Sequence, residues 1–144
     1  MTHTRRTLLA ASGVALAGVL LGAPRAQVTT VRAQERIAVA TTIGMIADLV
    51  RNTGGDRVEV TALMGPGVDP HLYKPSSGDV DVLSEADIIF YGGLHLEGRM
   101  VDTFEGIARS GKPTFAVTAG IPEEELIAIN DAHDPHVWFD VSLW

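Results

Sequence analysis

The sequence predicts an α/β fold in which a parallel four-stranded sheet is flanked by helices. Short β-rich apolar runs alternate with runs whose apolar residues recur at helical spacing, and glycines end the helical runs. In addition, 46% of the residues are hydrophobic and only 20% are charged, which is enough for a packed core. Alternation of strand and helix signals is typical of βαβ units, whose strands pair in parallel.

Each element follows from a local pattern. We expect strands over residues 36–42, 57–64, 87–93 and 113–120. We expect helices over residues 43–55, from Pro75 or Ser76 onward, and over residues 100–111. Ser76 and Asp79 have the spacing of a capping box with Asp in place of Glu, and Glu123–Glu125 after Pro122 are typical of an acidic first helical turn.

Residues 1–33 are expected to be an export signal. They carry Arg5-Arg6 and no acidic residue, followed by an apolar run over residues 8–21 that is short for a membrane span. The arginine pair resembles a twin-arginine signal, with a general secretory signal as the alternative. Small residues ending at Ala33 predict cleavage before Gln34.

Charge and cysteine content limit the partners. The net charge is −7 and all 18 acidic residues follow Ala33, which argues against binding to nucleic acid or to anionic lipid. The sequence contains no cysteine, so we expect neither a disulfide nor a lipid-modified cysteine. The secreted protein is therefore expected to occupy an extracytoplasmic space without a lipid anchor.

The candidate metal ligands are His71 and His136, each preceded by Asp-Pro. Proline fixes its own φ and keeps the preceding residue out of the α region, so each histidine leaves a stiff corner. Neutral imidazole is a good ligand for zinc and other transition metals. Asp69, Asp134 and Asp140 are available to orient the rings, but turn formation is the ordinary role of Asp before Pro or in a loop.

Two further histidines are weaker candidates. His133 is three residues before His136, but Pro135 between them removes helical geometry, so we expect a solvated neighbour. His95 follows the third expected strand and is interpreted as a polar loop residue, with a modulating role as the alternative. Signatures of common enzyme classes, such as H-E-x-x-H and G-x-S-x-G, are missing from the sequence.

Three motifs carry a family resemblance: MGPGVDPHLYKPSSGDV, ADIIFYGGLHLEGRM and DPHVWFDVSLW. They resemble the zinc and manganese solute-binding proteins of bacterial ABC transporters, of the TroA/ZnuA/MntC type, in the same order along the chain. The resemblance implies a monomer of two lobes joined by a long helix, with one metal ion in the cleft and a membrane permease as partner. It also implies that His71 and His136 are the two ligands from the N-terminal lobe, while the C-terminal lobe adds a His or Glu and an Asp.

We therefore expect residues 34–144 to be the N-terminal metal-binding lobe, truncated before the linking helix and the second lobe. The expected function is capture of a divalent transition metal, Mn²⁺ or Zn²⁺, for delivery to the permease. The short segment over residues 120–134, with one histidine, favours the manganese group. Two alternatives are a metal-dependent hydrolase that uses the same two histidines and a truncated, non-functional lobe.

Overall fold

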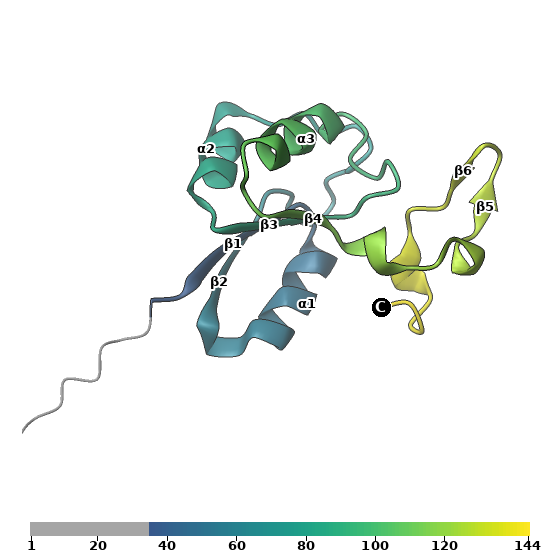
Figure 1. The fold of residues 1–144 in the computed structure, drawn as a ribbon, viewed down its shortest axis with the longest axis horizontal. Coiled ribbons are helices and arrows are strands. Elements are labelled where there is room, and N and C mark those ends of the chain that lie inside the picture. The colour runs from purple at the N-terminus through teal and green to yellow at the C-terminus, as the bar shows by residue number, and fades with distance from the viewer. Residues whose placement is uncertain (1–34) are drawn as a thin grey trace, which may run out of the picture. The chain divides into compact units, whose positions relative to one another are not determined.

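The structure, a computed structural model, describes residues 35–144 and is built around a four-stranded parallel sheet (Figure 1). The strands are β1 (Ile37–Thr41), β2 (Val58–Ala62), β3 (Ile88–Tyr91) and β4 (Thr114–Ala116). Their order across the sheet is β2-β1-β3-β4, with Ile37 opposite Val58 and Val39 opposite Ile88. The predicted α/β fold with a parallel four-stranded sheet is confirmed. The expected export signal and its cleavage site lie outside the described residues.

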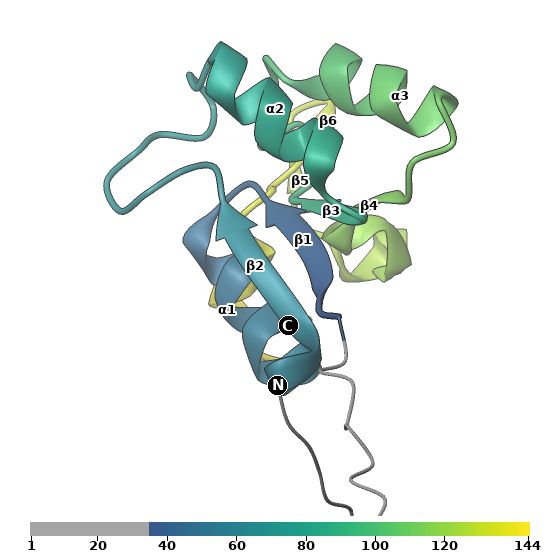
Figure 2. The same cartoon turned by 90° about the vertical axis from the view of Figure 1, so that its left-hand side faces the viewer.

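Helices cover both faces of the sheet. The helices are α1 (Gly44–Gly54), α2 (Ser77–Glu85) and α3 (Val101–Arg109). Figures 1 and 2 show α1 on one face and α2 and α3 on the other. The chain moves from β1 to β2 in one direction across the sheet and then crosses to β3 on the far side of β1. This reversal creates a topological switch point at the carboxyl ends of β1 and β3, where ligands bind in open α/β sheets.

The capping box predicted at the start of α2 is present. The Ser76 hydroxyl accepts a hydrogen bond from the Asp79 backbone N–H at 3.3 Å, and the Asp79 carboxylate accepts one from the Ser76 backbone N–H at 2.6 Å. These bonds satisfy two backbone N–H groups that would otherwise lack a partner at the helix end. The start of α2, and with it the end of the preceding loop, is therefore well defined.

Apolar side chains from all three helices form the core together with the sheet. Ile46 of α1, Leu83 of α2 and Phe104 of α3 are almost completely buried. Phe104 stacks on Tyr91 of β3 with ring centroids 4.4 Å apart. None of the helices within residues 35–144 is long and apolar enough to cross a membrane.

The chain beyond β4 differs from the expected structure. Residues Glu123–Glu125 form a single 3₁₀ turn instead of the first turn of an α-helix. Ile127 and Ile129, which follow, are two residues apart, a strand-like spacing that gives a helix no apolar face. The chain instead forms a small antiparallel hairpin of β5 (Ala128–Ile129) and β6 (Ala132–His133), which the sequence analysis did not predict. The fourth strand is also shorter than expected, because Val117–Gly120 turn into a 3₁₀ segment.

Candidate metal centre

The two Asp-Pro-His corners have the same local structure. In the loop after β2, Asp69 Oδ1 accepts a hydrogen bond from the His71 backbone N–H at 2.9 Å. After β6, Asp134 Oδ1 accepts one from the His136 backbone N–H, also at 2.9 Å. Such side-chain bonds two residues along the chain are typical of Asx turns, and the intervening proline stiffens each of them. The repeated sequence is therefore a repeated turn.

The two corners bring their imidazole rings together. The Nε2 atoms of His71 and His136 are 3.3 Å apart, although 65 residues separate them in the chain. The ring centroids are 5.3 Å apart and the ring planes meet at 61°. Two nitrogens bound to one tetrahedral zinc ion at about 2.0–2.1 Å are roughly 3–3.5 Å apart, so this spacing fits one ion between them.

The histidine pair lies at the carboxyl edge of the sheet. An open depression beside it is lined by residues that directly follow β1, such as Gly44, and residues that follow β2, such as Met64 and Gly65. This is the edge at which ligands bind in open α/β sheets. Because His71 is exposed and the depression is open, a solvated ion can reach the pair.

Asp134 also fixes the state of the His136 ring. Its Oδ1 lies 2.6 Å from Nδ1 of His136, so the ring donates its Nδ1–H and leaves the Nε2 lone pair free to bind an ion. Hydrogen bonds from the His136 backbone N–H and then from its ring lower the pKa of the Asp134 carboxyl below its ordinary value. The sequence analysis favoured turn formation alone for Asp134; the structure shows that it forms the turn and also orients the ring.

The other two aspartates have only the turn role. Asp69 Oδ1 contacts the backbone of His71, and Asp140 accepts hydrogen bonds from the backbone N–H and hydroxyl of Ser142 at 2.9 and 2.6 Å. Within the described residues neither carboxylate hydrogen-bonds an imidazole. The two metal-ligand candidates are therefore supported unequally, because only His136 has a carboxylate behind its ring.

The segment that carries His136 is anchored on the core. Val137, which begins the 3₁₀ turn Val137–Phe139, is buried, and Trp138 packs against the core cluster. The Trp138 ring meets the His136 ring edge-on, with centroids 5.3 Å apart and planes at 77°. The His136 ring is thus held between an indole and a carboxylate, which restricts its rotation.

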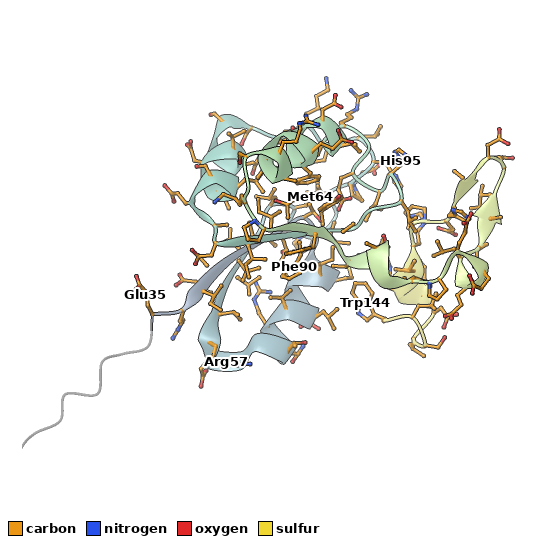
Figure 3. The ribbon with its side chains drawn as sticks, viewed as in Figure 1. Glu35, Arg57, Met64, Phe90, His95 and Trp144 are labelled. Atoms are coloured by element: carbon orange, nitrogen blue, oxygen red, sulfur yellow. The ribbon has the colours of Figure 1, made fainter. Side chains whose placement is uncertain are left out.

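His95 and His133 lie away from the pair. Both line a second cavity, beside Tyr91 and Glu97, and Figure 3 shows His95 at the end of the main body nearest the β5–β6 hairpin. His133 was expected to be a solvated neighbour, but it is half-buried in β6 and its Nε2 lies 3.8 Å from a carboxylate oxygen of Glu123. His95 is an exposed loop residue, as expected.

The described residues supply two ligands and no more at this place. Across residues 35–144 there is no group of three or more His, Cys, Asp or Glu side chains that could hold a metal ion. Two nitrogen ligands occupy half of a tetrahedral coordination shell. An ion at this pair would complete its shell with water or with ligands from outside these residues.

One buried polar residue near this edge is not revealed by any motif in the sequence. Glu97 is almost fully buried, and its carboxylate accepts hydrogen bonds from the Thr42 hydroxyl at 2.5 Å and the Gly92 backbone N–H at 2.8 Å. It thereby joins the carboxyl ends of β1 and β3 at the switch point. A single glutamate in an apolar loop gives no periodic signal, so the sequence alone did not single it out.

Comparison with known proteins identifies the family to which the chain belongs. The family model described as "Zinc-uptake complex component A periplasmic" (ZnuA) matches residues 39–144, and the chain belongs to this family. The expected family is thereby confirmed. It is a family of metal-uptake components and not an enzyme family.

Some individual relatives are named for manganese and others for zinc. The manganese-binding lipoprotein MntA of Bacillus subtilis is 48% identical over 114 residues, covering 78% of this chain and 37% of that protein. The zinc-binding protein TroA of Treponema pallidum is 50% identical over 107 residues, covering 74% and 34%. The solved structure of periplasmic zinc-binding TroA from T. pallidum aligns with a TM-score of 0.73 and 48% identity, over 76% of this chain and 40% of that one. The chain thus spans little more than a third of the length of these curated relatives.

Proposed function

We propose that this chain is the histidine-bearing lobe of an extracytoplasmic solute-binding protein. It captures Mn²⁺ or Zn²⁺ through Nε2 of His71 and His136 for delivery to an ABC transporter permease. The observation that carries the proposal is the 3.3 Å separation of these two Nε2 atoms, reached by two corners that share the same aspartate turn. Membership of a metal-uptake family gives this geometry a transport role.

The site is suited to capture and release. Two neutral imidazoles add no net charge, and an ion held by them alone keeps part of its water shell and can leave again. Asp134 fixes one ring in the ligand state before the ion arrives, which removes part of the ordering cost of binding. A hydrolase at the same pair would need a general base beside the ion, but the nearby carboxylates of Asp69 and Asp134 are both engaged in turns.

Both metals remain within the proposal. Imidazole nitrogen suits zinc, and the balance between nitrogen and oxygen ligands decides how well manganese competes. Relatives of similar identity are named for each: MntA for manganese and TroA for zinc. The protein acts as a monomer whose partner is the permease, and the net charge of −7 is unfavourable for binding to nucleic acid.

In this proposal export places the lobe outside the cytoplasm, and the names of relatives bear on its attachment to the membrane. MntA and the PsaA proteins of streptococci are named lipoproteins, which conflicts with the expectation of an unanchored protein. These 144 residues contain no cysteine that could carry a thioether-linked lipid. Intact-mass measurement of the exported protein distinguishes the two cases, because a lipid adds several hundred daltons, while cleavage before Gln34 leaves an unmodified chain.

Zinc and manganese titration of the chain tests the function. We expect reversible binding of one ion, lost when His71→Ala and His136→Ala are combined. His95→Asn is the matched control, because His95 lies outside the pair and has a φ of 62°, a conformation that Asn adopts more readily than other residues. Binding of undiminished affinity in the double variant would place the metal site elsewhere and overturn the proposal.

A further inference from the structure

The two proposed ligands differ in how their rings are held. The His136 ring has Asp134 on Nδ1 and Trp138 at its edge. Within residues 35–144, the His71 ring has no side-chain hydrogen-bond partner beyond its 3.3 Å approach to Nε2 of His136. His71 therefore depends on its backbone, and so on the loop between β2 and α2, for its direction.

Tyr73 fastens that loop to α2. Its hydroxyl donates to Asp79 Oδ2 at 2.8 Å, and the same oxygen accepts the Ser76 backbone N–H at 2.6 Å and the Ser76 hydroxyl at 2.7 Å. The Tyr73 ring is half-buried against the core cluster. Tyr73 is two residues beyond His71, so the segment with the histidine is held by the Asp69 turn before it and by Tyr73 after it.

The Tyr73 bond is not needed by the helix. The capping box of α2 is complete without it, because Ser76 and Asp79 already satisfy each other's backbone N–H groups. The phenol adds a third donor to an oxygen that has two, and what this third bond restrains is the loop. The Tyr73–Asp79 bond is therefore not required for the helix cap, but it restrains a residue two positions from the proposed ligand His71. This is what a positioning contact would do.

We propose that Tyr73 is a positioning residue for metal capture, which tethers the His71 corner to Asp79 so that Nε2 of His71 stays directed at Nε2 of His136. The inference rests on the proposed function, since it assigns a role toward an ion held by the two histidines. Without the tether, the corner samples more directions, and the ion binds to a smaller fraction of correctly arranged molecules.

Tyr73→Phe removes only the hydroxyl and keeps the buried ring. A hydrogen bond to a charged acceptor has a net value that corresponds to a change of roughly 10-fold or more in an equilibrium constant. In zinc titrations of the whole chain followed by NMR, we expect Tyr73→Phe to weaken binding about 3- to 10-fold. Tyr91→Phe is the matched control, because Tyr91 is also half-buried and its hydroxyl has no hydrogen-bond partner in the described part of the chain. The zinc affinity of the Tyr91→Phe variant should be unchanged.

A second comparison separates positioning from general stability. In a His71→Ala background the tether has no ligand to position, so adding Tyr73→Phe should leave the residual zinc affinity unchanged. Equal losses for Tyr73→Phe and Tyr91→Phe, or a loss that persists in the His71→Ala background, would overturn the inference. If His71→Ala weakens zinc binding but Tyr73→Phe leaves it unchanged, the tether is overturned and the proposed function is not. If His71→Ala also leaves zinc binding unchanged, the proposed function itself is overturned.

Discussion

A single oxygen of Asp134 accepts two hydrogen bonds from His136, one from the backbone N–H at 2.9 Å and one from ring Nδ1–H at 2.6 Å. The first bond shapes the turn and the second fixes which ring nitrogen carries the proton. One side chain therefore sets both the position of the imidazole and its readiness to bind an ion.

The first prediction compares Asp134→Asn with Asp69→Asn. Asparagine keeps the turn in both corners, but a neutral amide oxygen is a weaker acceptor for the His136 ring than a carboxylate. We expect Asp134→Asn to lower zinc affinity by about 10-fold, at the lower end of typical effects for partners of metal ligands. Asp69→Asn, which touches only backbone, should change the affinity less than 3-fold; titration of both variants checks this, and equal effects would remove the ring contact as the cause.

The second prediction concerns the pH dependence of stability through Asp79. Burial by itself would raise the pKa of this carboxyl, but hydrogen bonds from the Ser76 backbone, the Ser76 hydroxyl and Tyr73 outweigh burial and lower the pKa. A folded pKa below the unfolded value of about 3.9 means that the carboxylate stabilises the fold above that value. This contribution is lost as the pH falls through the lower folded pKa.

Urea unfolding of Asp79→Asn beside the unsubstituted chain measures this contribution. The difference in unfolding midpoint should be constant above about pH 5 and shrink below about pH 4, where the unfolded chain takes up a proton on Asp79 before the folded chain does. Asp81→Asn on the exposed surface of the same helix provides the control. A difference that grows as the pH falls would contradict the assignment.

The third prediction is that Glu97→Gln destabilises the fold by about 1–3 kcal/mol. The substitution is nearly isosteric, and an amide oxygen in the place of Oε1 still accepts from Thr42 and Gly92, but as a neutral and weaker acceptor. The NH₂ group replaces Oε2, so the Gly93 N–H, 3.4 Å from that oxygen, loses its acceptor. Glu59→Gln, on the exposed face of β2, should change the free energy of unfolding by less than about 0.5 kcal/mol. Urea unfolding at neutral pH gives both values. Similar results for the two variants would mean that the hydrogen bonds accepted by Glu97 add nothing to stability.

The fourth prediction contrasts Gly93→Ala with Gly44→Ala. Gly93 has a φ of 85°, and a Cβ there would lie 2.4 Å from the Thr118 hydroxyl oxygen and 2.9 Å from the Ala116 Cβ. At Gly44, the first residue of α1, a Cβ would meet no atom within 4 Å. We expect Gly93→Ala to lower the free energy of unfolding by about 2 kcal/mol or more, and Gly44→Ala to raise it by about 0.4–1 kcal/mol. Thermal or urea unfolding distinguishes these opposite signs.

The parallel sheet was predictable because its signals are local and repeated. Apolar runs of strand length, helical spacing and glycine stops recur over 110 residues, so an error in one element does not change the fold class. The stiff Asp-Pro-His corners are equally local, since proline restricts its own and the preceding backbone angles. The short β5–β6 hairpin was not predictable in this way, because strands of two residues are shorter than any periodic pattern.

The different roles of Asp69 and Asp134 could not be predicted from their identical sequence motifs. The two stretches share Asp-Pro-His, and in both the aspartate accepts from the histidine backbone. Only the second carboxylate meets the imidazole, and the His136 ring also contacts Trp138, which packs against the core cluster. The 3.3 Å approach of His71 to His136 likewise depends on tertiary structure that no short motif encodes.

The edge-on contact between Trp138 and His136 gives the protein a built-in optical probe. The indole centroid is 5.3 Å from the imidazole centroid, and the second tryptophan, Trp144, is 6.5 Å from Trp138. An ion bound to His136 would place a double positive charge beside this chromophore and change its emission. Paramagnetic Mn²⁺ should quench the emission, whereas diamagnetic Zn²⁺ should only shift or rescale it, so unlabelled fluorescence could report both the occupancy of the site and the identity of its cargo.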